Sequence, residues 1–446
     1  MVFVYILKTD FKLLKFYKKL NNKSKKSLAI LYLFNRNYFI CQFENIIFWL
    51  SSLEFKEKYQ NHHYPPLLNP KKINYEKINA KLAWDLNIAL PQVKLFIWGS
   101  HGCGATGLKM FLKKCEVMPI VSIQCNSGIK NYIFYYKQIL YFKDKNPCFW
   151  LREYISSKLA DKFYALLPKV NEAICLVRDP IDSLFSMFYC RNFGKNYLDK
   201  INIGDDIEQV LKFRVGYYKA KEFPDKKDLK DYIIDITGFL GFHDALLIKK
   251  LSNIKKTYFL DMSEIVGDKT FETMKKLALK FHFKTPNSKD REFYTQTMSS
   301  FRILLPININ LKKFFNEDIF ITLRTSSLNS LEKDISCLFF KNTKIPFYIL
   351  IQEKHFNQIK SLKENEFEEI RLFLVQFLEA LKAKEKEERQ KRLSIDEFFK
   401  CFLEDKENIK DFKDILEKNH LFYVKKERPD IVNLWENYKK FEKLIK

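Results

Sequence analysis

The chain has 446 residues, of which 47% are hydrophobic and 16% aromatic. This apolar share excludes a chain that is disordered throughout, and the length predicts two or more structural units. Lys and Arg number 78 against 54 Asp and Glu, which gives a formal net charge of +24. The excess is typical of a lysine-rich solvated surface or of anionic partners. No nucleic-acid partner is expected, because the chain has no zinc-finger, RNA-binding or helix-turn-helix signature.

Residues 1–65 predict a basic, helical N-terminal extension. Lys8, Lys12, Lys15 and Lys19 recur at helical spacing. The pattern fits a solvated helix packed on the main domain, or an amphipathic helix in peripheral contact with an anionic membrane. No secretory signal and no uncharged run of about 18 residues occurs, so we expect a cytoplasmic protein, with a peripheral place at the inner membrane surface as the alternative.

Four of the 11 glycines fall within nine residues, at Gly99, Gly102, Gly104 and Gly107. Residues 93–98 before them predict a buried strand, and residues 108–112 begin a helix. In a strand, glycine loop and helix of this kind, backbone N–H groups and the helix N-terminus can bind an anion, usually a phosphate. The alternative is a turn that only lets the strand and the helix pack.

The loop is close to a P-loop, G-x-x-x-x-G-K-[ST]. Gly99, Gly104 and Thr106 match this pattern, and Ala105 stands where the phosphate-binding lysine belongs. Ordinary ATP or GTP hydrolysis is therefore not expected, because the β- and γ-phosphates lack their usual counter-ion.

A second apolar strand, 173–177, leads into another helix start. Asp179 is a good N-cap and Pro180 suits the first helical position. Arg178 then lies at the carboxyl end of the strand, and Ser186 lies further along the helix. This is either a well-capped helix start alone or a second phosphate site, built from an arginine fork and a hydroxyl.

Together the two segments resemble the sulfotransferase superfamily, whose sulfuryl donor is 3′-phosphoadenosine-5′-phosphosulfate (PAPS). In that family a glycine loop, G-x-P-[KR]-S-G-T-T, holds the 5′-phosphosulfate, and R-[DN]-P-x-x-x-x-x-S holds the 3′-phosphate. The resemblance implies an α/β fold with a parallel-sheet, P-loop-like core flanked by helices, and no metal. It implies that the cofactor-binding residues are Gly99, Gly102, Cys103, Gly104, Ala105, Thr106, Gly107, Arg178 and Ser186.

The first motif departs from the family pattern at three positions. Gly102 replaces the Lys or Arg, Cys103 replaces Ser, and Ala105 replaces the first Thr. The lost cation matters because sulfuryl transfer needs positive charge at the bridging oxygen as it leaves. His101 in the loop and Lys109 in the first helical turn are the catalytic candidates to replace it. A solvated helix face is the simpler role for Lys109, and a small loop filler the simpler role for Cys103.

Residues 257–265 and the helix 268–281 look like the family's third strand, turn and helix, so the resemblance spans roughly residues 93–283. Five residues are candidates for the acceptor base by chain position only: Glu116, Glu153, His243, Asp261 and Glu264. The segments 64–70 and 78–86 also resemble uncharacterised epsilon-proteobacterial proteins with this glycine loop, which implies a family but no function.

The pattern along the chain predicts four segments. They are the N-terminal extension 1–65, a sulfotransferase-like α/β domain 66–300, a small α+β extension 301–360 and a helical C-terminal region 361–446. Expected strands of the α/β domain are 94–98, 119–124, 173–177 and 257–260. Two further strands, 319–323 and 347–351, either extend the same sheet or form a separate addition. Ser394 and Glu397 predict a capping box.

The sequence thus predicts a divergent sulfotransferase-like protein that transfers a sulfuryl group from PAPS to a hydroxyl of a carbohydrate or cell-envelope acceptor. The alternative is a non-catalytic nucleotide-binding or interaction protein on the same fold.

Overall fold

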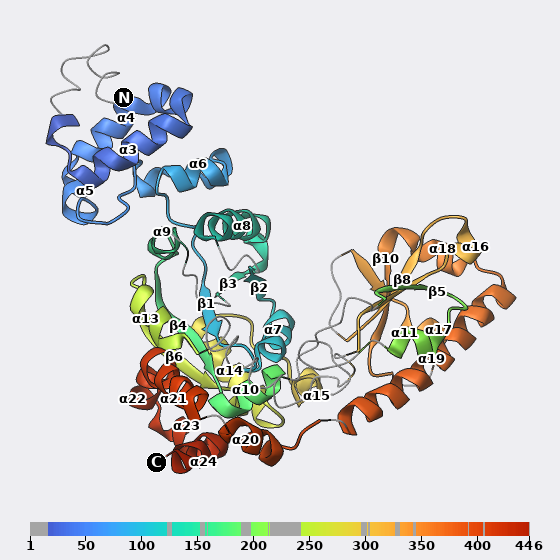
Figure 1. The fold of residues 1–446 in the computed structure, drawn as a ribbon. Helices are drawn as coiled ribbons and strands as arrows, with labels where there is room; N and C mark the ends of the chain where they lie inside the picture. Colours follow the sequence, from blue (N-terminus) through green and yellow to red (C-terminus); the bar gives the residue numbers. More distant parts are fainter. Residues whose placement is uncertain are drawn as a thin grey trace. The chain divides into compact units, whose positions relative to one another are not determined.

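The structure is a computed structural model, shown in Figure 1. It describes residues 17–122, 127–151, 157, 159–188, 198–212, 214, 242–295, 301, 304–325, 331–341, 345–390, 392–404 and 406–445. These residues divide into two compact units that are interleaved along the chain. Unit 1 lies within Met1–Val177, Leu240–Arg291 and Leu416–Leu434, and unit 2 within Arg178–Phe239, Glu292–Ile415 and Trp435–Lys446.

Unit 1 contains a five-stranded, all-parallel sheet in the order β2-β3-β1-β4-β6. Its strands are β1 (Leu95–Gly99), β2 (Met118–Val121), β3 (Pro147–Leu151), β4 (Val170–Val177) and β6 (Ile254–Asp261). All five residues of β1 and the last five of β4 are buried, as expected where helices cover both faces of a parallel sheet. Three of the expected strands are thereby confirmed. The fourth, 119–124, is confirmed in part, because residues 123–126 lie outside the described residues.

Helices surround this sheet and precede it. They are α3 (Asn22–Phe34), α4 (Arg36–Ser51), α5 (Leu53–Lys58), α6 (Ala80–Asp85), α7 (Ala105–Lys114), α8 (Gly128–Tyr141), α9 (Ala160–Ala165), α13 (Asp244–Lys250) and α14 (Lys269–Phe281). Near the C-terminus, unit 1 adds the π-helix η9 (Leu416–Leu421), α22 (Phe422–Glu427) and α23 (Pro429–Leu434). In Figure 1, α22 lies beside α13, although residues 251–421 separate them in sequence.

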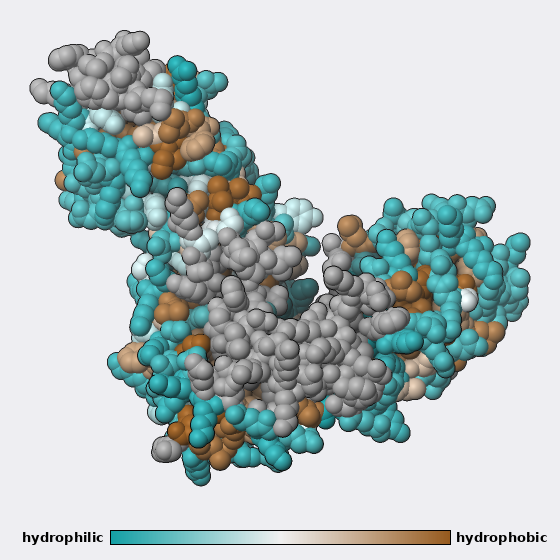
Figure 2. Space-filling model, in the orientation of Figure 1, coloured by the Kyte–Doolittle hydropathy of each residue, from teal (hydrophilic) through white to brown (hydrophobic). Residues whose placement is uncertain are grey.

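The helical character expected of the N-terminal segment is confirmed from residue 17 onward, whereas Lys8, Lys12 and Lys15 lie outside the described residues. The Trp49 indole donates a hydrogen bond to the Pro66 carbonyl, so the proline-rich stretch packs against these helices. In the face shown in Figure 2, the described surface is mostly hydrophilic, with several gatherings of apolar side chains, one of them over the N-terminal helices. Contact with a membrane surface stays a prediction.

Unit 2 contains a mixed sheet in the order β5-β7-β8-β10-β9, in which only β5 and β7 run parallel. Its strands are β5 (Lys200–Asn202), β7 (Ile307–Asn310), β8 (Phe320–Arg324), β9 (Glu332–Asp334) and β10 (Tyr348–Gln352). The long helix α19 (Glu364–Gln390) buries one apolar face in the same core as β7, β8 and β10. The strands expected at 319–323 and 347–351 therefore belong to a separate sheet and do not extend the first.

Further helices of unit 2 are distributed along its segments. They are α10 (Pro180–Phe188), α11 (Ile207–Lys212), α16 (Lys312–Phe315), α17 (Ser336–Phe339), α18 (Phe356–Lys360), α20 (Ile395–Leu403), α21 (Lys406–Ile415) and α24 (Glu436–Leu444). The predicted capping box of Ser394 and Glu397 starts α20. Every helix among the residues that the structure describes is too short or too polar to span a bilayer.

Candidate functional site

The order of the parallel strands reverses between β1 and β4. From β1 the chain passes through α7 to β2, beyond β3, whereas the chain that leaves β4 returns as β6 on the other side. Gly99 at the end of β1 pairs with Leu176 near the end of β4, so the two carboxyl ends are neighbours. In open parallel α/β sheets, ligands bind outside the carboxyl ends of the strands at such a reversal point.

The glycine loop begins directly at this point. A Cβ on Gly99 would lie 2.6 Å from the Leu176 carbonyl oxygen, so no side chain fits there. Gly102 and Gly104 have φ angles of 77° and 90°, the left-handed region that glycine adopts readily. Gly104 is the N-cap of α7 and has no side chain to cap the helix. The first N–H groups of α7 have no carbonyl partner within the helix and are thus available to an anion.

The other residues of the loop differ in their burial and in their contacts. The Cys103 thiol is 1% exposed and donates to the Ser100 carbonyl oxygen at 2.6 Å, so it fills the interior of the loop. Thr106 is exposed and Ala105 half-buried in the first turn of α7. A Cβ on Gly107 would meet only the Phe111 ring, at 3.7 Å, so the structure does not require glycine at this position.

The two candidate cations, Lys109 and His101, lie in different surroundings. Lys109 is half-buried, and its Nζ lies 5.7 Å from the centroid of the Trp150 ring on β3. This cation–π contact replaces the solvated helix face that the sequence favoured for Lys109. Trp150 belongs to β3, which borders β1 on the side away from β4. His101 is half-buried within the loop itself.

The turn after β6 packs against the loop. A Cβ on Gly104 would lie 3.0 Å from the Met262 side chain, so the third stretch of the resemblance lies beside the first. Asp261 and Glu264 form a capping box around η5 (Met262–Ile265), and the Glu264 carboxylate lies 3.6 Å from the Arg428 guanidinium. The carboxylates of Asp261 and Glu264 therefore stabilise this turn.

The other candidate bases divide between two environments. Glu116 is exposed and forms an ion pair with Lys284. His243 is half-buried, and burial lowers its pKa. Glu153 lies outside the described residues.

In unit 2, Arg178 comes directly after the last residue of β4, and α10 follows it. The predicted N-cap is confirmed, because Asp179 Oδ1 accepts the Ile181 N–H at 2.9 Å. Arg178 and Ser186 are both half-buried, and Ser186 lies near the end of α10.

The C-terminal helix docks on this turn, a contact that the sequence analysis missed. The Tyr438 N–H of α24 donates to Asp179 Oδ2 at 3.0 Å, and the Asn437 amide donates to Asp182 at 2.7 Å. Burial raises the pKa of Asp179 to about 6. The helix start that follows Arg178 is thus fixed by residues from the far end of the chain.

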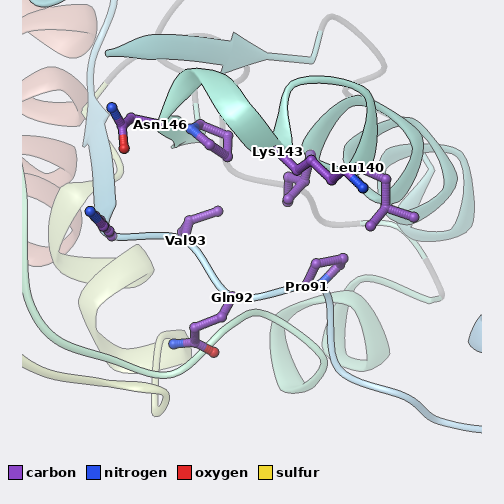
Figure 3. A pocket seen from close by; sticks show the side chains of 9 residues that line it. Pro91, Gln92, Val93, Leu140, Lys143 and Asn146 are labelled. Atoms are coloured by element: carbon purple, nitrogen blue, oxygen red, sulfur yellow. The ribbon is translucent and has the colours of Figure 1, made fainter. Parts of the chain in front are cut away.

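A pocket of about 200 Å³ lies near the amino-terminal ends of the parallel strands, opposite the ends that the glycine loop follows (Figure 3). Pro91, Val93 and Lys94 line it just before β1, together with Pro147 at the start of β3. It thus opens at the amino ends of the strands, away from the glycine loop. No three His, Cys, Asp or Glu side chains are grouped as metal ligands among the described residues.

Comparison with known proteins yields one match. A family model described as "Protein of unknown function (DUF2972)" matches residues 259–446, which is less than half of the chain. No curated protein and no solved structure matches the chain. The matched segment begins inside β6 and includes η9 and α24.

Proposed function

We propose that the chain binds PAPS on a P-loop-like core and transfers its sulfuryl group to a hydroxyl of a carbohydrate or cell-envelope acceptor. The observation that supports this proposal is that the two motifs follow neighbouring strands of the parallel sheet in sequence. The glycine loop follows β1 and Arg178 follows β4, the neighbouring strands at which the strand order reverses.

In this proposal the loop N–H groups and the start of α7 hold the 5′-phosphosulfate, and Arg178 and Ser186 hold the 3′-phosphate. The acceptor oxygen bonds to sulfur while the bond from sulfur to the bridging oxygen breaks. Adenosine 3′,5′-bisphosphate leaves with the electron pair, and the hydroxyl proton passes to a base. His101 or Lys109 stabilises the charge that develops on the bridging oxygen.

A second candidate is nucleotide binding without transfer. Two observations favour it. Ala105 stands at the position of the phosphate-binding lysine, and the Cys103 thiol is directed to the Ser100 carbonyl and fills the loop.

Isothermal titration with adenosine 3′,5′-bisphosphate tests the binding step. We expect Arg178→Ala to raise the Kd about 10- to 100-fold, because a charge-assisted hydrogen-bonding fork to the 3′-phosphate is lost. Arg371→Ala is the matched control, since Arg371 pairs with Glu368 on α19, and it should leave the Kd unchanged. Equal affinity of Arg178→Ala and the wild type would remove the 3′-phosphate site from the proposal.

Release of adenosine 3′,5′-bisphosphate from PAPS, with a cell-envelope extract as the source of acceptor, separates the two candidates. We expect His101→Gln or Lys109→Gln to lower the rate about 10²- to 10³-fold, the usual effect of removing one group that stabilises a developing anion. The affinity for the bisphosphate should change much less. A wild type that binds the bisphosphate but releases none from PAPS would establish the second candidate.

A further inference from the structure

A group of polar side chains is buried in unit 1 next to the glycine loop. Ser100 of the loop is 7% exposed, Asp244 at the start of α13 is 2% exposed, and His420 of the π-helix η9 is 3% exposed. Buried polar groups cost free energy unless they are paired, so each needs a structural reason. π-helical turns often occur at functional positions.

These side chains form one connected chain of contacts. The Phe242 N–H donates to Ser100 Oγ at 3.2 Å. Ser100 and Cys175 both hydrogen-bond to the Asp244 carboxyl group, and Asp244 Oδ2 lies 3.2 Å from His420 Nδ1. The glycine loop is thereby linked to α13 and, through His420, to the C-terminal segment that the family model matches.

The backbone beside Ser100 is strained. Phe242 is fully buried and has a φ of 63°, a left-handed conformation that bulky residues rarely adopt. Its ring meets the His420 ring edge-on, with centroids 5.2 Å apart. Such strain persists only where the surroundings determine it, and it gathers at functional sites.

Between about pH 3 and 7 both groups of the pair are neutral, because burial disfavours both charged forms. It raises the pKa of Asp244 to about 7 and lowers that of His420 to about 3. Asp244 Oδ2 and His420 Nδ1 lie 3.2 Å apart, and neither atom forms a hydrogen bond within the described residues. The other titratable groups that act on the pair are neutral as well, since burial raises the pKa of the Cys175 thiol and lowers that of His243.

We infer that Asp244, which is in contact with His420, is a positioning residue that fixes the glycine loop through Ser100. Through its contact with Asp244, His420 of the C-terminal segment thus helps to fix the conformation of the glycine loop. This group is too deeply buried to touch a ligand, and its effect passes through the loop conformation. Only the effect on ligand affinity rests on the proposed function.

Hydrogen–deuterium exchange of peptides covering residues 99–107 tests the inference without any ligand. Asp244→Asn keeps the size of the side chain and an acceptor for Ser100, so it should exchange like the wild type. Asp244→Leu has a similar size without polar atoms, and we expect its loop exchange to rise about tenfold. Peptides within α14 serve as the control for global unfolding. If Asp244→Leu does not fold, Ser100→Ala provides the milder variant with the same expected direction.

Titration of the same variants with adenosine 3′,5′-bisphosphate separates this inference from the proposed function. A Kd that rises in Asp244→Leu and not in Asp244→Asn supports both. The expected exchange pattern without binding in the wild type would leave the positioning role intact and remove the proposed ligand. Loop exchange in Asp244→Leu and Ser100→Ala equal to that of the wild type would overturn the positioning role.

Discussion

Gly99→Ala is expected to destabilise unit 1 by about 3 kcal/mol or more, since overpacking costs typically about 1–3 kcal/mol and the obstacle here is backbone. The added Cβ would lie 2.6 Å from the Leu176 carbonyl oxygen and 3.0 Å from the Leu176 Cβ. Neither atom is the end of a flexible side chain, so β1 would have to move away from β4. The change therefore acts on the pairing that brings the two carboxyl ends together.

Gly107→Ala is the matched control, because it adds the same methyl group eight residues away. Its Cβ would make an ordinary contact with the Phe111 ring. Since Gly107 lies inside α7, alanine should raise the stability by up to about 1 kcal/mol.

Urea unfolding followed by tryptophan fluorescence measures both effects. Four of the five tryptophans, Trp49, Trp84, Trp98 and Trp150, belong to unit 1, so the signal reports mainly on that unit. A midpoint for Gly99→Ala equal to that of the wild type would contradict the close pairing of β1 and β4.

The parts of the fold that the sequence predicted depend on local patterns. β1 and the last five residues of β4 are continuous apolar runs, as strands buried on both faces must be, and β6 contains the shorter apolar run 258–260. Asp179 and Ser394 are caps that act within three residues of themselves. β3 was missed because it is short, begins with Pro147, and contains no β-branched residue.

The contacts that position the candidate site are non-local, so no local pattern could reveal them. Asp179 and Tyr438 are 259 residues apart, and Asp244 meets a histidine from a C-terminal stretch whose sequence predicts only helix. Lys109 was interpreted as a solvated lysine because nothing near it in sequence indicates the Trp150 ring. Residue type and spacing identified the two turns, and the tertiary structure shows what holds each of them.

The Asp244–His420 pair leads to the second large expected effect, opposite pH dependences of stability in its two single variants. In the folded wild type the proton stays on Asp244, whose pKa is about 7, while that of His420 is about 3. In the unfolded chain the ordinary values, about 3.9 for Asp and 6.5 for His, place the proton on the histidine. Between about pH 4 and 6.5 both states thus hold one proton, and the pair adds little pH dependence.

When either partner is replaced, the folded and unfolded states no longer bind the same number of protons. In Asp244→Asn the folded His420 stays neutral while the unfolded histidine binds a proton, so stability should fall as the pH drops below about 6.5. In His420→Gln the folded Asp244 stays protonated while the unfolded aspartate ionises, so stability should fall as the pH rises from about 4 toward 7. Each slope approaches 1.4 kcal/mol per pH unit, roughly the free energy of binding one proton more in one state.

Urea midpoints at several pH values between 4.5 and 6.5 measure these slopes. Subtracting the wild-type curve cancels groups that all three proteins share, including Asp179 and His243, both of which have shifted pKa values. Cys175 does not titrate in this range, because burial raises its pKa well above the ordinary value. Difference curves of opposite sign would establish that both groups are desolvated in the folded chain, with the pKa of Asp244 raised and that of His420 lowered. Three parallel curves would show that Asp244 and His420 titrate as they do in water, and the buried link behind the glycine loop would then be wrong.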